Sequence, residues 1–415
     1  MNTKRTFVFL FMIISIVSYT NADNNTPMQQ SVRGIVGDYD TAIHTKGQVR
    51  LGYITFNEAN APRTSGYAVG GHIHFDTARY YGLKLALSAY GVLDLGINQN
   101  PWHQNPYFFD AKGKSFVTLS KAFLDGKWGN TQVRLGRQIL DTPLADSDDI
   151  RMMPNFFEAY TITNTDIDRL TLTAGYIDKM AGWENGVDAS RFVAISNVLG
   201  ASEAMSGVAF IGATYEGIPN ASISAWYYRY DDVADVVYAE ASYAYAFRLC
   251  DTVLSLQYAH GNDSGDALLG KRDASTWGVS LSAEIPDTGV SLMAAYNRDN
   301  GQTGAIDLSL GGGPFFTSME DLTIDAIAGE GTAWVLSSGY DATQAGIDGL
   351  NVGIAYGMFR SDTPSTHFHA SETDIIVNYT WNDRIRITCA YALVDHKDDG
   401  MDDYDQLRVI GSYGF

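Results

Sequence analysis

Cysteine, proline and basic residues are all scarce in this chain of 415 residues. It contains 2 cysteines and 10 prolines, and its 28 lysines and arginines stand against 48 aspartates and glutamates. Cys250 and Cys389 are too few and too far apart to hold together a small disulfide-rich domain, and we interpret them as isolated small apolar residues. The acidic excess argues against nucleic acid as a partner, because phosphates bind in basic grooves.

Long apolar runs are also missing after residue 22. No stretch there offers the roughly 18 or more consecutive apolar residues of a membrane-spanning helix. Before that point, Lys4 and Arg5 precede the apolar run 7–17, and the residues 20–22 (TNA) end it. This order is typical of a cleaved secretory signal. Residues 1–22 are therefore predicted to be a signal peptide, and losing its two cations lowers the formal charge from −20 to −22.

Glycine and aromatic residues are abundant, and apolar and polar residues alternate through most of the chain. There are 41 glycines and 25 tyrosines, with only 18% charged residues, which favours many strands and turns. In 384–394 (RIRITCAYALV) the odd positions are apolar, and the even ones include Arg384, Arg386 and Thr388. Successive side chains of a strand point to opposite faces, so this pattern predicts a strand with one apolar and one polar face.

About eighteen such segments follow one another, each roughly 8–13 residues long, which is the length of a tilted membrane strand. Tight turns alternate with long, polar, acidic gaps. The long gaps are 98–113, 140–156, 181–205, 262–273, 299–331 and 395–404. Short turns at one end and long loops at the other are typical of an outer-membrane barrel, whose closed sheet satisfies every backbone group in lipid.

We therefore predict an all-β fold, a transmembrane antiparallel β-barrel of about 18 strands over residues 46–415. Residues 23–45 would form a periplasmic lead-in. The alternative is a secreted β-sandwich or β-solenoid. Sandwich strands average nearer five or six residues without this loop asymmetry, and no repeat of fixed length supports a solenoid.

The polar face of the strands would line the lumen, and its cations concentrate on the first and last strands. They form a predicted basic ladder: Arg50, Lys84, Arg134, Arg169, Arg384, Arg386 and Arg408. Guanidinium groups in a water-filled channel attract carboxylates and phosphates and offer them bidentate hydrogen bonds. The alternative is that these cations pair with loop acids and stiffen the barrel, and both roles are compatible.

The gap after the fifth predicted strand is acidic and contains two prolines. Its charged residues are Asp141, Asp146, Asp148, Asp149 and Arg151. Outside the barrel, the aspartates would only repel anions; folded inward, they would face the arginines and narrow the pore. The prolines suit a fixed, non-helical path. Arg151 is expected to pair with Asp146, Asp148, Asp149 or the barrel wall.

Two stretches resemble a known family, the OprD-type porins. Residues 135–138 (LGRQ), followed by the acidic segment up to Pro154, resemble that family's third-loop region. Residues 311–316 (GGGPFF), Trp334 and 346–350 (GIDGL) are similar to its late glycine–aromatic loop and turn, with Asp348 in place of proline. The resemblance implies an eighteen-strand barrel with an inward-folded third loop, a narrow eyelet, and a basic ladder that guides small carboxylate-bearing solutes.

Other clusters of polar residues are weaker signals of chemistry. His72 and His74 would share the lumen face at a spacing that one metal ion could bridge with further ligands, although a plain polar lining is favoured. The acidic runs 146–149 and 395–405 could bind Ca²⁺ through carboxylate oxygens, but solvated loop acids are favoured and no cofactor is expected. Neither a G-x-S-x-G nor an H-E-x-x-H pattern occurs, so an enzyme is not expected.

The predicted function is that of an outer-membrane porin for passive diffusion of small hydrophilic solutes, such as ions, amino acids and small carboxylates. The alternative is a structural or adhesive surface protein with a narrow or closed barrel. Expected partners are outer-membrane lipid, lipopolysaccharide and small polar solutes, and the sequence leaves a homotrimer and a monomer equally open.

Overall fold

The computed structural model describes residues 44–98, 105–301, 306–363, 367–397 and 400–415. The predicted signal peptide, 1–22, lies outside these residues. So does the predicted lead-in, 23–45, except for its last two residues. His44 and Thr45 already belong to the first strand, so the barrel starts slightly earlier than the alternation indicated.

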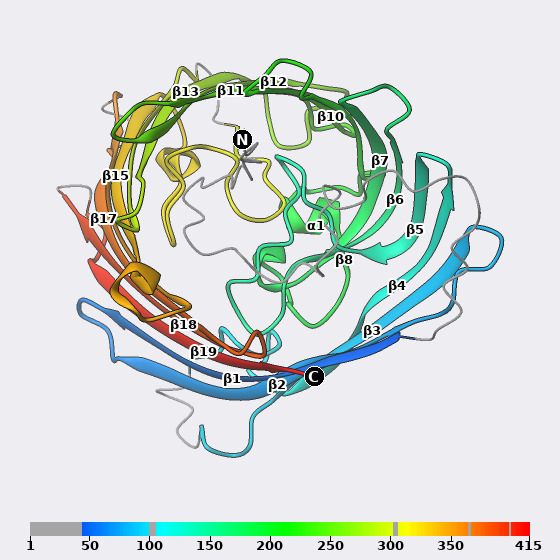
Figure 1. Ribbon diagram of the computed structural model, residues 1–415, viewed down its shortest axis with the longest axis horizontal. Coiled ribbons are helices and arrows are strands. Elements are labelled where there is room, and N and C mark those ends of the chain that lie inside the picture. Colours follow the sequence, from blue (N-terminus) through cyan, green and yellow to red (C-terminus); the bar gives the residue numbers. More distant parts are fainter. Residues whose placement is uncertain (1–43, 99–104, 302–305, 364–366, 398–399) are drawn as a thin grey trace, which may run out of the picture.

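The alternating segments form a closed antiparallel barrel (Figure 1). Its strands are β1 (His44–Glu58), β2 (Thr64–Asp76), β3 (Leu83–Leu93), β4 (Phe116–Trp128), β5 (Thr131–Gln138), β6 (Phe156–Asn164), β7 (Leu170–Ala181), β9 (Val208–Tyr215), β10 (Ala221–Tyr230), β11 (Ala234–Ala246), β12 (Asp251–Asp263), β13 (Asp273–Ile285), β14 (Val290–Asp299), β15 (Gly331–Asp341), β16 (Leu350–Ser361), β17 (His369–Trp381), β18 (Ile385–His396) and β19 (Tyr404–Gly414). The prediction of about 18 strands is confirmed.

The barrel closes where its first and last strands pair. β1 and β19 run antiparallel, in register from Gln48 opposite Gly414 to Glu58 opposite Tyr404. One further short strand, β8 (Val193–Ala194), pairs with β7 over two residues and is not part of the wall. Four short helical turns complete the described elements: η2 (Trp183–Asn185), α1 (Ile195–Val198), η3 (Ile324–Ile327) and η4 (Ala342–Ala345). Within the described residues, no helix is long and apolar enough to cross a membrane.

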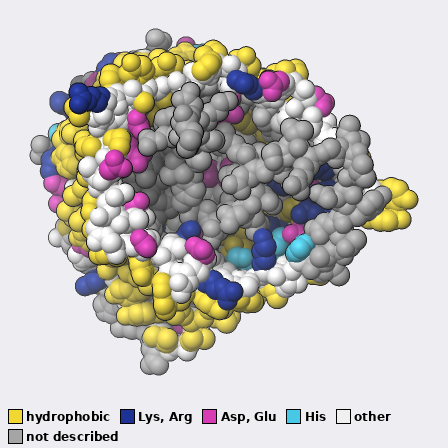
Figure 2. Space-filling model, viewed as in Figure 1, with side chains coloured by type: hydrophobic (Ala, Val, Ile, Leu, Met, Phe, Trp, Pro, Cys, Tyr) yellow, Lys and Arg dark blue, Asp and Glu magenta, His cyan; other side chains and the backbone are white. Residues whose placement is uncertain are grey.

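The outer face of the barrel is apolar. Leu51, Leu256 and Leu336 point outward and are 60%, 53% and 54% exposed. In the view of Figure 2, hydrophobic side chains lie along the top, left and lower edges of the barrel. These residues would cost free energy in water, at roughly 25 cal/mol per Å² of apolar surface. In a bilayer they face lipid instead, so the exterior is built for a membrane.

Part of the inner face is also apolar, which corrects the expectation that the lumen face is polar throughout. Tyr228 and Tyr230 of β10 and Tyr238 of β11 point inward and are almost fully buried. They belong to a hydrophobic cluster with loop residues such as Leu144 and Phe315. An inward side chain that packs against a loop can be apolar, because it is not in contact with water. Strand alternation alone therefore could not distinguish inward positions that line the lumen from inward positions that loops cover.

One prediction concerns the pairing of β1 with β2. Gly71 has φ of 139°, and a Cβ placed there would lie 1.9 Å from the carbonyl oxygen of Gln48. A residue held in a strained backbone conformation costs about 1–3 kcal/mol. Gly71→Ala adds a clash to this strain, so it should lower the free energy of unfolding of the barrel by more than that amount. The measurement is the temperature at which the folded band converts to the unfolded band on a semi-native gel.

The matched control is Gly91→Ala, on the neighbouring strand opposite Gly71. Its Cβ would meet nothing nearer than 3.5 Å, so its conversion temperature should stay close to that of the wild type. Equal conversion temperatures for the two variants would contradict the prediction.

Candidate functional site

A cavity of about 870 Å³ lies inside the barrel and is lined by wall strands and by loops. Three of the predicted ladder cations, Arg50, Arg386 and Arg408, line it, together with two loop carboxylates, Asp149 and Glu320. The charged groups of the candidate site therefore come from both the wall and the loops. Figure 2, which looks down the barrel, shows the hollow that the wall encloses.

The pairing of the strands places the three arginines together. Arg386 of β18 lies opposite Ser412 of β19, and Ser412 lies opposite Arg50 of β1. Arg50 and Arg386 thus flank Ser412 in one inward-facing row. Arg408 lies four residues before Ser412 on the same strand and face. Closure of the sheet is what brings positions 50, 386 and 408 into one patch.

Residues 140–155, which we call the crossing segment, reach from one side of the barrel interior to the other. The backbone N–H of Leu144 donates to the hydroxyl of Tyr228 on β10, at 3.4 Å. Five residues later, Asp149 pairs with Arg50 on β1. In the strand order β1 and β10 lie about half the barrel apart. The crossing segment therefore contacts opposite walls.

The contact between Arg50 and Asp149 is bidentate. Arg50 Nη1 donates to Asp149 Oδ1 at 2.6 Å, and Arg50 Nη2 donates to Asp149 Oδ2. Arg50 Nη1 also donates to the carbonyl oxygen of Arg151 at 3.3 Å. The two side chains are 9% and 4% exposed. A planar guanidinium matched to both carboxylate oxygens is a strong and directional pair, and it fixes the crossing segment against β1.

A second loop supplies the carboxylate for Arg408. Residues 306–322, which we call the inner loop, carry Glu320, and Arg408 Nη2 donates to its Oε2 at 2.6 Å. The two loops also bond to each other. Leu310 N donates to the carbonyl oxygen of Leu144 at 2.9 Å, and Asp146 N donates to that of Leu310 at 3.2 Å. The loops therefore form one body inside the barrel.

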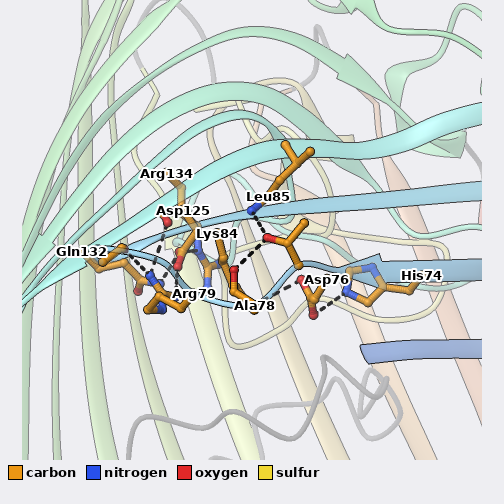
Figure 3. A network of polar contacts seen from close by, with 11 residues as sticks. His74, Asp76, Ala78, Arg79, Lys84, Leu85, Asp125, Gln132 and Arg134 are labelled. Carbon is orange, nitrogen blue, oxygen red and sulfur yellow. Dashed lines mark hydrogen bonds and ion pairs between the residues drawn. The ribbon is translucent and has the colours of Figure 1, made fainter. Parts of the chain in front are cut away.

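Two further ladder cations pair with wall carboxylates (Figure 3). Arg134 Nε donates to Asp125 at 2.9 Å, and Lys84 Nζ lies 3.4 Å from Asp76. Asp125 also accepts from Arg79, in the turn before β3. The sequence reading missed Arg79, because it stands outside the alternating segments. Since two guanidinium groups share the fully buried Asp125, this part of the wall keeps a positive charge.

The other two predicted ladder cations, Arg169 and Arg384, do not line the cavity. Arg169 lies in the turn before β7 with φ of 58°, and its side chain is 57% exposed beside Asp168. Arg384 follows Asp383, which has φ of 56°, and precedes β18. Both residues belong to tight turns, where the backbone leaves the strand conformation. Strict alternation therefore no longer decides which way their side chains point.

Arg151 does not form any of the ion pairs that were expected with Asp146, Asp148 or Asp149. Its guanidinium lies 5.8 Å from the ring centre of Tyr107 and 5.3 Å from that of Trp183. Its burial, together with the nearby Arg408, lowers the pKa of Arg151 to about 10. Arg151 thus packs where three loops meet, and aromatic faces supply part of its stabilisation.

Two other acids of the crossing segment accept hydrogen bonds from within the segment. Asp141 accepts from the hydroxyl of Ser147 at 2.6 Å, and Asp146 accepts from the backbone N–H of Asp148 at 3.0 Å. Glu184, which the sequence reading did not single out, accepts from Gly312 N at 2.7 Å and from Asn155. Nothing in its local sequence marks Glu184, because its partners come from distant loops.

Burial changes the titration of this second acidic group. Desolvation, with Asp141 nearby, raises the pKa of Asp146 to about 7. Desolvation, with Asp148 nearby, raises the pKa of Glu184 to about 8. Both carboxyl groups therefore change charge within the physiological range, whereas ordinary acids stay ionised there.

The histidine pair lines the cavity, as its position on β2 predicts. The ring of His72 stacks on Tyr90 with 4.5 Å between ring centres, and His74 Nε2 lies 3.0 Å from Asp76 Oδ2. Among the described residues, no three His, Cys, Asp or Glu side chains are spaced to hold a metal ion. For the acidic runs 146–149 and 395–405, solvated loop acids stay the prediction, with Ca²⁺ binding as the less favoured alternative.

A closed barrel with an apolar exterior and a charged inner cavity defines a class, the channel-forming barrels of the bacterial outer membrane. Comparison with known families agrees. The model of the outer membrane porin family OprD matches residues 64–415, so the chain belongs to the OprD family of outer membrane porins. This is a family of channels and not of enzymes, and it gives no support to the adhesive alternative. The resemblance drawn from the loop motifs is thereby confirmed.

Solved structures share the fold at low sequence identity. OccK9 (OpdG) of Pseudomonas aeruginosa is 20% identical with a TM-score of 0.78, and the match covers 90% of this chain and 98% of that one. OpdK of P. aeruginosa is 19% identical with a TM-score of 0.75, over 89% and 98%. A BenF-like porin of Pseudomonas fluorescens Pf-5 is 16% identical with a TM-score of 0.74, over 89% and 98%. No curated protein matches the sequence significantly.

The raised pKa values of Asp146 and Glu184 predict pH-dependent ion selectivity. As the pH falls from 9 to 6, both carboxyl groups gain protons and the loops lose negative charge. The cation-to-anion permeability ratio in planar bilayers should then fall. One unit charge at about 4 Å in water is worth about 1 kcal/mol, so each group contributes at most about fivefold.

Asp146→Asn should remove the change in permeability ratio near pH 7, because Asn has no titrating carboxyl group. Asp168→Asn is the control, because its side chain is 95% exposed in a turn and its removal should leave the pH profile unchanged. A permeability ratio that is flat between pH 6 and 9 in the wild type would refute the prediction.

Proposed function

We propose that solutes pass along the basic wall formed by β18, β19 and β1, beside the crossing segment and the inner loop. The observation that carries this proposal is the patch of Arg50, Arg386 and Arg408 on the cavity, faced by Asp149 and Glu320. Charged side chains that line a pore set which ions and polar solutes pass through it. In this proposal the crossing segment is the constriction.

The solute class that fits this site is small molecules that carry a carboxylate. An arginine fork binds a carboxylate through two parallel hydrogen bonds, and Arg50 already holds the Asp149 carboxylate in this way. A solute carboxylate would meet the same chemistry at the neighbouring Arg386. Among the similar structures, that of OpdK was determined with vanillate. This supports a small carboxylate as the solute class proposed for this chain.

Lipopolysaccharide around the outer rim, and either a monomeric or a trimeric state, stay predictions. The finer role of the basic ladder belongs to this proposal as well. Arg50, Arg386 and Arg408 would contact the solute in the passage. Lys84 and Arg134 would keep the potential positive along the wall of β3 to β5, through the network with Arg79.

Conductance measurements on Asp149→Asn test the role of the ion pair. Loss of this carboxylate leaves Arg50 uncompensated on the cavity, so the cation-to-anion permeability ratio in asymmetric KCl should fall by about two- to fivefold. Asp141→Asn removes the same charge from the same segment but away from Arg50, and should change the ratio less. An equal effect of both variants would show that the Arg50–Asp149 contact has no special role.

Liposome swelling tests the solute class. Vesicles that contain the protein should admit small mono- and dicarboxylates faster than neutral sugars of similar size, and Arg50→Gln combined with Arg386→Gln should reduce this preference. Equal swelling rates for acids and sugars in the wild type would refute the proposed solute class. Absence of single-channel conductance in every salt would refute the proposed diffusion pathway itself.

A further inference from the structure

Two buried acidic residues of the wall, which are not part of the basic ladder, attach the inner loop to the barrel. Glu372 and Asp374 follow each other at an interval of two on β17, so both point inward. They are 0% and 1% exposed. Neither pairs with a lysine or arginine at ion-pair distance among the described residues. Two buried acids without such a cation need another source of stabilisation.

That stabilisation comes from three consecutive backbone N–H groups of the inner loop. Glu320 N donates to Asp374 Oδ2 at 3.2 Å. Asp321 N donates to Glu372 Oε1 at 2.9 Å, and Leu322 N donates to Glu372 Oε2 at 2.7 Å. Both oxygens of Glu372 and one of Asp374 thus accept from the loop backbone, and buried polar groups paired in this way are costly to separate. The backbone of 320–322 is therefore held in one place and orientation against β17.

The side chains of Glu320 and Asp321 face the other way, toward the basic wall. Glu320 pairs with Arg408, and both line the cavity. The carboxylate of Asp321 accepts from Gln406 Nε2 at 2.9 Å. It also lies within electrostatic range of Arg151. The loop thus carries two carboxylates whose positions depend on what holds its backbone.

Neutral side chains fasten several other parts of the inner loop. Gln257 accepts from Phe316 N at 2.7 Å, and Asn297 accepts from Thr317 N at 3.1 Å. Tyr230 donates to the carbonyl oxygen of Leu308 at 2.6 Å. At 320–322 the acceptors are carboxyl groups, as at Gly312, whose backbone N–H donates to Glu184. The part of the loop at 320–322 is the one that reaches Arg408. The attachment at 320–322, which has three consecutive N–H donors, therefore coincides with the charged edge of the passage.

We infer that Glu372 and Asp374 are positioning residues that set the ion selectivity of the channel by placing Glu320 against Arg408. This inference rests on the proposed function, since it assumes that Arg408 and Glu320 border the path of the solute. A released loop would withdraw Glu320 and leave the Arg408 charge uncompensated. Selectivity would then shift toward anions, although neither Glu372 nor Asp374 is exposed to the cavity.

A double-mutant cycle with Glu320→Gln and Glu372→Gln separates positioning from a direct electrostatic effect. Each single variant should lower the cation-to-anion permeability ratio by about two- to fivefold. If Glu372 acts through Glu320, the double variant should match Glu320→Gln alone. If Glu372 acts only through its own electrostatic field, the fold-changes of the two single variants should multiply in the double variant. The inference would then be wrong.

A second readout is the open-channel noise, which a lost charge alone would not change. Glu372→Gln and Asp374→Asn should each add brief partial closures at constant voltage, because the loop moves more freely. Glu284→Gln is the matched control: it removes an inward carboxylate that lines the cavity near the opposite end of the barrel, and should leave the noise unchanged. Heat-modified gel mobility checks that each variant is folded.

The outcomes distinguish this inference from the proposed function. A wild-type channel that conducts, with Glu372→Gln and Asp374→Asn variants of unchanged noise and unchanged permeability ratio, would overturn the inference and leave the proposed pathway standing. A wild-type protein without conductance would refute the proposed function. If Glu372→Gln does not fold, the same comparison with Asp374→Asn and Glu320→Gln decides the inference.

Discussion

The pairing of β1 with β19 is the constraint on which the rest of this structure depends. In lipid no water satisfies a free backbone group, so the sheet must close on itself, and here it closes along the whole shared length of the two strands. Closure gives each strand one face toward lipid and one toward the interior. It also brings together residues from the two ends of the chain, such as Arg50 and Arg408, which are more than 350 positions apart in the sequence.

The interior is then divided between a packed body and a passage. The crossing segment and the inner loop bond to each other at Leu144, Asp146 and Leu310. They bury the tyrosines of β10 and β11 in an apolar core. A large empty lumen would leave these side chains in water, whereas loops that fill it stabilise the barrel from within. In the proposed pathway, solutes use the remaining side, where the wall is basic.

Most of the cations on the inner wall lie against a carboxylate. Arg50, Arg408, Lys84 and Arg134 each have a carboxylate partner, so the number of arginines says little about the potential that a solute meets. What matters is how firmly each carboxylate is held. Asp149 is fixed by its bidentate contact, and Glu320 by the backbone anchor at Glu372 and Asp374. In the inference drawn here, selectivity depends on buried residues that the solute never contacts.

By itself, the sequence determined the strands, their number, the outward apolar face and the family, because alternation and loop length are local properties of the chain. It also placed Arg50, Arg386 and Arg408 on the inner face. Its ladder also included Arg169 and Arg384, which lie in turns and do not line the cavity. It offered Arg151 a loop carboxylate or the barrel wall as partner, whereas Tyr107 and Trp183 lie against its guanidinium. It could not identify Glu184, Glu320 or Glu372 as site residues. Their partners lie tens to hundreds of residues away, and only the closed barrel with its packed loops brings such groups within hydrogen-bonding distance.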